Sequence, residues 1–154
     1  MTHDILVLGG GPIGLELATE IATRSQSVTF VDGESMANRA REAGLTAHES
    51  TLETTPSVDC SAATVVVATP SDGRNLLLGA AAPRAFGADR VIALVNDPDR
   101  RAVFEDAGIE TVCVSRAVAG ATVGSLAVED SSVVEDSTTP DRAAETDERV
   151  RLRD

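Results

Sequence analysis

Three glycines near the start of the chain have the spacing of a phosphate-binding turn. Residues 9–14 read Gly-Gly-Gly-Pro-Ile-Gly and follow the apolar run Ile5–Leu8. Gly9 would permit a tight turn out of a strand, and Gly11 would let backbone amides approach a phosphate. Gly14 would let the next helix pack closely on that strand, with its free N–H groups facing the anion. The motif therefore predicts a nucleotide-phosphate site at residues 9–14.

An acidic residue follows at the distance expected for ribose recognition. Asp32 lies 18 residues after Gly14, at the end of the apolar run Val28–Val31. A carboxylate there accepts hydrogen bonds from a ribose diol and repels a 2′-phosphate. The pattern favours NAD or NADH, or else ATP, ADP or AMP, over NADP. The alternative interpretation of a glycine triplet is an ordinary strand-to-helix turn that binds nothing.

The residue types absent from the chain argue against catalysis. It contains no lysine and no tyrosine, so a Tyr–Lys hydride-transfer site, a Walker-type P-loop and a Schiff-base site cannot form. His3 and His48 are its two histidines, and they lie far apart without an obvious third ligand, so no metal site is predicted. His48 could border the pocket, although an exposed histidine is the simpler interpretation. We therefore expect a binding module rather than an enzyme.

The charge balance argues against nucleic acid as a partner. Among 154 residues, 25 are acidic and 13 are basic, all of them arginine, for a net charge of −12. Phosphate backbones are held by lysine and arginine patches, which this composition does not favour. An acidic surface without lysine instead indicates a halophilic protein, in which salt screens the repulsion.

No segment of the sequence predicts export or insertion into a membrane. The N-terminus has no basic region before its first apolar run, so a secretory signal is not expected. No apolar run reaches the roughly 18 residues of a transmembrane helix. The expectation is a cytoplasmic protein that reaches a membrane only through a partner.

Alternating short apolar runs and helical patterns predict an α/β fold. Strands are expected at residues 4–8, 28–31, 64–68, 91–96 and 111–114, with a weaker one at 45–48, and helices at 12–24, 35–43, 72–86, 99–107 and 117–126. Residues 50–63 could hold one short helix and a turn. Strands that are apolar on both faces indicate a Rossmann-like, doubly wound and mostly parallel six-stranded sheet with helices on both faces.

The organisation along the chain changes near residue 128. Residues 1–128 are expected to form the nucleotide-binding domain, and the acidic residues 129–154 a disordered tail or linker. A final helical turn near residues 143–152 is possible within that tail.

Several motifs beyond the glycines resemble the TrkA-N domain, also called RCK or KTN, which regulates potassium transporters and channels. Residues 66–75 (Val-Val-Ala-Thr-Pro-Ser-Asp-Gly-Arg-Asn) resemble the family's fourth strand, its Ala-Thr turn and the asparagine that opens the next helix. Residues 93–98 (Ala-Leu-Val-Asn-Asp-Pro) resemble the end of its fifth strand, and residues 104–109 the approach to its sixth. The resemblance covers residues 4–126.

The resemblance also implies a site, partners and an assembly. Together with the glycine motif it gives these cofactor-binding residues: Gly9, Gly10, Gly11, Pro12, Ile13, Gly14, Asp32, Gly33, His48, Glu49, Ala68, Thr69, Pro70 and Asn75. It implies a homodimer or higher homo-oligomer that contacts a membrane potassium transporter, with the small-residue segment 117–124 as the candidate dimer contact. The alternative for this segment is a helix that packs on the sheet of its own chain. Two departures matter: many relatives have arginine at the position of Pro12, and residues 47–50 replace the family's Gly-Asp-Ala-Thr-like segment. The N-terminal domain of an NAD-dependent oxidoreductase, or of a phosphoesterase fusion protein, is the alternative function.

Overall fold

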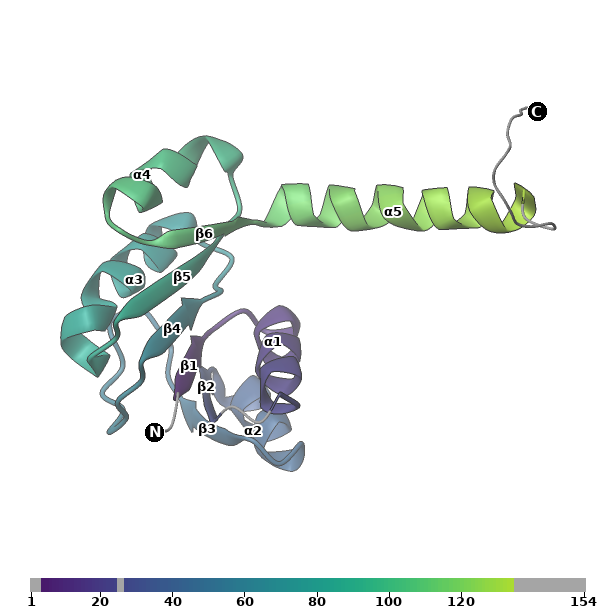
Figure 1. Ribbon diagram of the computed structural model, residues 1–154. Coiled ribbons are helices and arrows are strands. Elements are labelled where there is room, and N and C mark those ends of the chain that lie inside the picture. Colours follow the sequence, from purple (N-terminus) through teal and green to yellow (C-terminus); the bar gives the residue numbers. More distant parts are fainter. Residues whose placement is uncertain (1–3, 25–26, 135–154) are drawn as a thin grey trace. The chain divides into compact units, whose positions relative to one another are not determined.

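A single parallel sheet organises the first 115 residues of the chain (Figure 1). The computed structural model describes residues 4–24 and 27–134. Its six strands lie in the order β3-β2-β1-β4-β5-β6, and each neighbouring pair is parallel. The strands are β1 (Ile5–Leu8), β2 (Val28–Asp32), β3 (Thr46–Glu49), β4 (Thr64–Val67), β5 (Arg90–Val95) and β6 (Glu110–Cys113). This order reverses direction between β1 and β4, as in the doubly wound dinucleotide-binding fold.

Helices connect the strands and cover both faces of the sheet. They are α1 (Pro12–Ala22), α2 (Glu34–Glu42), α3 (Asp72–Phe86), the 3₁₀ turn η1 (Pro98–Arg100) and α4 (Arg101–Asp106). A last helix, α5 (Val114–Val134), follows β6 directly. The chain divides into two compact units, residues 1–115 and 116–154.

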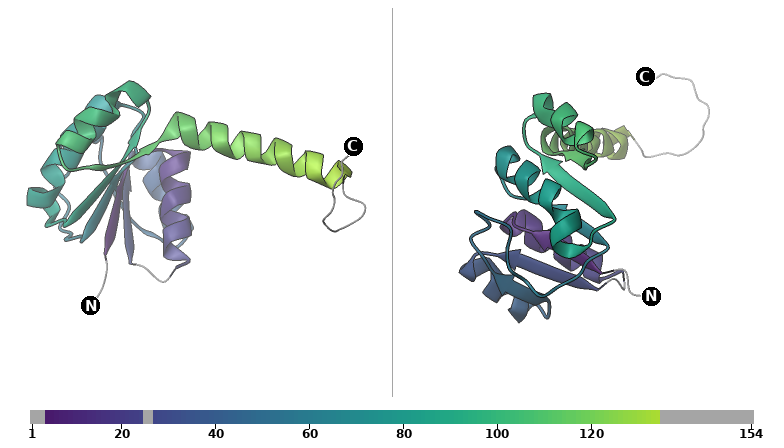
Figure 2. Two further views of the ribbon diagram at one scale, coloured as in Figure 1. Left: turned by 45° about the horizontal axis from the view of Figure 1, so that its top comes forward. Right: turned by 90° about the vertical axis from the view of Figure 1, so that its left-hand side faces the viewer.

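Alternation along the strands divides the core into two layers. Leu6 and Leu8 of β1 point to a cluster that includes Leu78 and Phe86 of α3 and Phe104 of α4. The intervening Val7 points to the opposite cluster, with Ala18 of α1 and Ala37 and Ala40 of α2. Figure 2 shows the sheet between these two sets of helices. Both faces of the sheet are therefore covered, which explains why its strands are apolar on both sides.

The predicted fold class and the order of elements are confirmed, and α3 has the predicted bounds. The weak strand at residues 45–48 is present as β3, one residue later. Residues 50–63 contain no helix, so the short helix expected there is wrong. Leu52 in this segment has a positive φ of 59°, and its buried side chain anchors the loop to the core.

The last helix is longer than expected at both ends. It begins at Val114 rather than 117 and continues to Val134, so residues 129–134 are helical, whereas the sequence predicts a disordered tail from residue 129. Residues 135–154, including the possible turn at 143–152, lie outside the described residues, and the division at residue 128 stays a prediction. Among the described helices, none is both long and apolar enough to cross a membrane.

Candidate nucleotide-binding site

The glycine loop between β1 and α1 has a backbone that only glycine adopts easily. Gly9, Gly10 and Gly11 have φ values of 76°, 101° and 55°, the left-handed region that side chains disfavour. Gly14 lies so close to the loop that an added Cβ would fall 1.8 Å from the carbonyl oxygen of Gly9. Three glycines therefore shape the turn, and the fourth brings α1 against the end of β1.

The space outside Gly11 is open. A Cβ placed there would meet no atom within 4 Å, whereas one on Gly9 would lie 2.6 Å from the Thr69 methyl group. Gly11 is also the N-cap residue of α1, whose N-terminus receives no side-chain cap, and Pro12 occupies the first turn as predicted. An uncapped helix N-terminus beside open space is suited to an anion. The loop thus fits a nucleotide phosphate, and a side chain at Gly11 would occupy its place.

Asp32 fixes this loop to the end of β2. Its Oδ2 accepts a hydrogen bond of 2.9 Å from the backbone N–H of Gly11, and its Oδ1 one of 2.8 Å from the N–H of Gly33. Each carboxylate oxygen keeps a second lone pair, so Asp32 can still accept hydrogen bonds from two ribose hydroxyl groups. The backbone N–H of Gly11 is thus used within the protein and does not face the open side of the loop. Asp32 therefore shapes the loop as well as offering acceptors.

The end of β3 lies beside Asp32. Glu49 is the register partner of Asp32, and His48 that of Val31. Both side chains are exposed, so His48 is an exposed strand residue next to the predicted ribose position. Gly33 directly follows β2 and is the N-cap residue of α2. These residues border the site on the side of β2.

The end of β4 forms the opposite wall of the glycine loop. Thr69 and Ala68 are buried. Outside the glycine loop and the start of α1, Thr69 is the nearest neighbour of a Cβ added to Gly9, and Ala68 is the nearest neighbour of one added to Gly10. Pro70 is exposed. Asn75 is fully buried: its Oδ1 accepts from the Thr69 N–H at 3.0 Å and the Thr69 hydroxyl at 2.6 Å. Its Nδ2 donates to the carbonyl oxygens of Thr69 and Leu94, both at 2.9 Å.

Asn75 therefore has every polar atom of its side chain engaged inside the protein. Its hydrogen bonds support the turn at Thr69, and a contact between Asn75 and a ligand would break one of them. Among the predicted residues, His48, Glu49 and Pro70 are exposed at this edge, whereas the buried Asn75 holds the turn at Thr69 in place.

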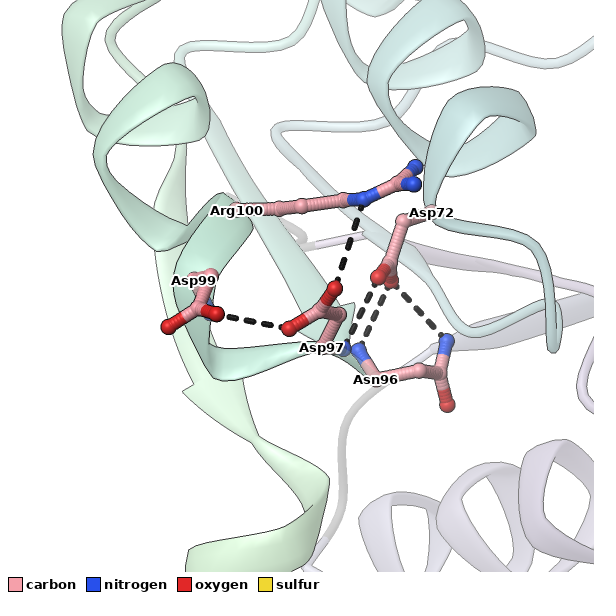
Figure 3. Close-up of polar contacts among 5 residues, drawn as sticks. All are labelled: Asp72, Asn96, Asp97, Asp99 and Arg100. Carbon is pink, nitrogen blue, oxygen red and sulfur yellow. Dashed lines mark hydrogen bonds and ion pairs between the residues drawn. The ribbon is translucent and has the colours of Figure 1, made fainter.

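A second polar cluster at the same edge was not predicted as part of the site. Asp72, the first residue of α3, is only 8% exposed, and its Oδ1 accepts from the backbone N–H of Asn96 at 2.7 Å and from Nδ2 of Asn96 at 3.1 Å. Its Oδ2 accepts from the N–H of Asp97 at 2.8 Å (Figure 3). Asp97 in turn caps η1 and forms a 3.6 Å ion pair with Arg100. The Asn-Asp-Pro sequence after β5 was the available signal for this cluster.

The hydrogen bonds determine the charge state of Asp72. Burial alone would raise the pKa of this carboxyl group, but the N–H donors of Asn96 and Asp97 outweigh it and hold the pKa below its ordinary value. Asp72 is thus a buried carboxylate that joins the loop after β5 to the first turn of α3.

These features together suit ligand binding. The carboxyl ends of β1, β2 and β4 meet at one edge, where an uncapped helix, an acceptor pair on Asp32 and a glycine turn converge. Among residues 4–24 and 27–134, no group of three or more His, Cys, Asp or Glu side chains is arranged to hold a metal ion. The arrangement can bind a phosphate and a ribose.

Comparison with known proteins identifies the family. The family model of the TrkA-N domain matches residues 5–115, most of the chain. The chain belongs to the TrkA-N family. Its relatives include a Trk system potassium uptake protein TrkA homolog from Methanothermobacter thermautotrophicus, 28% identical over 113 residues. This match covers 70% of the chain and 52% of that relative, so the chain spans about half of its length.

Two solved structures share the fold of this TrkA-N chain. The NAD(P)-binding domain of an exopolyphosphatase-related protein from Archaeoglobus fulgidus is 23% identical with a TM-score of 0.69, and the match covers 80% of this chain and 97% of that one. The TrkA-N domain of the inner membrane protein ybaL from Escherichia coli is 17% identical with a TM-score of 0.66, covering 82% and 98%. At these identities the likeness establishes the fold alone.

Proposed function

We propose that this TrkA-N chain is a non-catalytic regulatory module that binds an adenine nucleotide at its glycine loop. NAD or NADH is the preferred ligand, with ATP, ADP and AMP as the other candidates. The observation that carries the proposal is the position of Asp32, whose two oxygens bond to Gly11 and Gly33 at 2.9 and 2.8 Å. One carboxylate thereby connects the loop suited to phosphate with the strand end suited to ribose.

The proposed output of the module is control of potassium transport. A relative that matches 70% of this chain is named a Trk system potassium uptake protein TrkA homolog, which supports a membrane transporter as the partner of a cytoplasmic module. Regulation by a ligand requires that the ligand bind two states of the protein with different affinity. A homodimer would provide such states through changes in packing between its subunits.

The absence of catalysis is part of this proposal. Hydride transfer needs a proton donor or acceptor near the reacting carbon, and this chain has neither tyrosine nor lysine to supply one. Its two histidines are His3 and the exposed His48. Asp72, the buried carboxylate of the second polar cluster, has both oxygens engaged by N–H groups.

The test is a calorimetric titration with NAD, NADH, NADP, ATP, ADP and AMP in parallel. We expect NAD to bind at least about tenfold more tightly than NADP, because Asp32 would face the 2′-phosphate in a partly desolvated site. Asp32→Asn removes this charge and should bring the two affinities close together. Glu34→Gln removes a neighbouring exposed charge and should keep the preference. Equal affinities of the parent protein for NAD and NADP would contradict the role of Asp32.

A domain of an enzyme is the second candidate. It is favoured by the likeness to the NAD(P)-binding domain of an exopolyphosphatase-related protein. In that case the catalytic residues would lie in another domain or chain. To separate this candidate from a regulatory module, nucleotide turnover is measured with the full protein that the gene encodes, including any neighbouring domain.

A further inference from the structure

The side chain of Asn96 is held in one orientation at the end of β5. Its Nδ2 donates to the carboxylate of Asp72 at 3.1 Å and to the carbonyl oxygen of Thr69 at 3.3 Å. Both neighbours are acceptors only, so the nitrogen and not the oxygen of the carboxamide must face them. Figure 3 shows the result: the Asn96 oxygen points away from Asp72.

That oxygen is an available acceptor. Within residues 4–24 and 27–134, no donor bonds to Oδ1 of Asn96, and the residue is exposed. Its backbone N–H is already used by Asp72 at 2.7 Å, so the loop cannot swing without breaking a buried bond. The structure therefore presents a fixed carboxamide oxygen at the edge where strands β1, β4 and β5 end.

Thr69 connects this oxygen to the glycine loop. The carbonyl oxygen of Thr69 accepts from Asn96, and the Thr69 methyl group packs against Gly9. In the strand order, β4 and β5 lie on one side of β1, whereas β2 with Asp32 lies on the other. A dinucleotide lies across the point where the strand order reverses, with one half on each side of β1. Asn96 is thus on the side opposite to the ribose that Asp32 would bind.

We propose that Asn96 is a ligand contact for the second half of a dinucleotide, and that Asp72 is the positioning residue that orients it. The ligand class is a nucleotide with hydroxyl or amide donors beyond its second phosphate, as in NAD or NADH. A mononucleotide such as AMP would end before reaching Asn96. This inference rests on the proposed function, because it assigns a subsite of the same cleft.

The experiment compares NAD and AMP binding to three variants by calorimetry, with folding checked by circular dichroism. Asn96→Ala removes the carboxamide but leaves the backbone N–H that bonds to Asp72. Asp72→Asn keeps the shape of the carboxylate but places an amide against N–H donors. Asp99→Asn, in the same loop, is the matched control, because the side chain of Asp99 bonds to neither Asp72 nor Asn96 in the described structure.

We expect Asn96→Ala to weaken NAD about threefold to tenfold, the loss of one hydrogen bond, and to leave AMP unchanged. Asp72→Asn should cause the same selective loss together with a lower melting temperature, and Asp99→Asn should match the parent protein. The ratio of the NAD and AMP affinities is the decisive quantity, since a merely structural defect would weaken both ligands.

Equal weakening of NAD and AMP, or no change in either, would overturn the inference while leaving the nucleotide site intact. A parent protein that binds neither NAD nor AMP would instead overturn the proposed function, and the subsite with it.

Discussion

The glycines of the loop have distinct roles although they share one side chain. Gly14 is needed for close packing, since an added Cβ would lie within 3.0 Å of both Gly9 and Phe30. Gly11 faces open space and is needed for its φ of 55° and for the room it leaves to a ligand. Substitutions at the two positions should therefore separate stability from binding.

Gly11→Val should abolish nucleotide binding and leave a folded protein. The backbone strain at a positive φ costs about 1–3 kcal/mol, but the added side chain meets no protein atom near Cβ. Gly14→Ala is the matched comparison and should cost at least about 3 kcal/mol, because its Cβ would overlap the backbone of Gly9. Circular dichroism melts and titration on the same samples measure both effects. A folded Gly11→Val protein that binds nucleotide like the parent would contradict the phosphate site.

Asp72→Asn should lower the free energy of unfolding in a pH-dependent way. The carboxylate of Asp72 is stabilised by N–H donors, so its pKa is lower in the folded state than in the unfolded state. Its contribution is therefore fully present above the unfolded pKa of about 3.9 and is lost as the pH falls through the folded value. We expect the variant to be less stable by about 1–3 kcal/mol at pH 7, and this difference to shrink below about pH 4. Urea unfolding of both proteins at several pH values measures it, and a difference independent of pH would exclude the carboxylate as its cause.

At the scale of elements, the sequence was most informative where one local rule acts alone. Apolar, β-branched runs predicted β1 and β4, and glycine spacing with Pro12 predicted the start of α1. The helical pattern predicted the Asp72–Phe86 helix. These signals succeed because periodicity and turn chemistry are local properties of the sequence. The end of α5 could not be placed this way, since an acidic segment is compatible with both a solvated helix and a tail. The roles of Asn75 and Asn96 depend on hydrogen bonds between segments up to 27 residues apart, which no local pattern encodes.

Helix α5 combines exposure with a lack of charge. Residues 117–128 include no charged side chain, in a chain with 25% charged residues. The side chains of residues 115–127 are exposed, and Val118, Val123 and Leu126 are each more than half exposed. An uncharged helix of small and aliphatic residues is typical of a surface that another protein covers. This supports the predicted dimer contact at residues 117–124.

Val123→Arg should convert a dimer into monomers. A charge placed within a packed helix interface loses its hydration without gaining a partner, which costs several kcal/mol. Val112→Arg, at another exposed valine on β6, is the control and should leave the dimer intact. Light scattering after size-exclusion chromatography gives the masses. A monomeric parent protein, or a dimeric Val123→Arg variant, would refute the contact.

At the scale of the whole molecule, charge dominates the surface. The 25 acids and 13 arginines leave 12 unbalanced negative charges, and among the described residues three ion pairs are formed, all by exposed side chains. Exposed ion pairs contribute little to stability, so they offset only part of the repulsion. Mobile cations must screen the rest.

The melting temperature should therefore rise by several degrees as potassium chloride increases from dilute to molar concentration. The Debye length falls from about 30 Å at 0.01 M to about 3 Å at 1 M, which removes repulsion between distant carboxylates. The same series near pH 4, where about half of the carboxylates are protonated, should be much flatter. A melting temperature independent of salt at neutral pH would refute the halophilic interpretation and leave the fold unaffected.

The strand order also determines when the site can exist during synthesis. The central strand β1 is made first, but its neighbour β4 pairs with it through Thr64 and Val65, long after the glycine loop and Asp32 have left the ribosome. Until then one edge of β1 has unpaired N–H and C=O groups, and parallel pairing over such distances is slow. A nascent chain that ends at residue 63 would hold the glycines and Asp32 but not the Thr69 wall. Such a fragment would leave this edge of β1 open to pairing with other chains before its nucleotide site is complete.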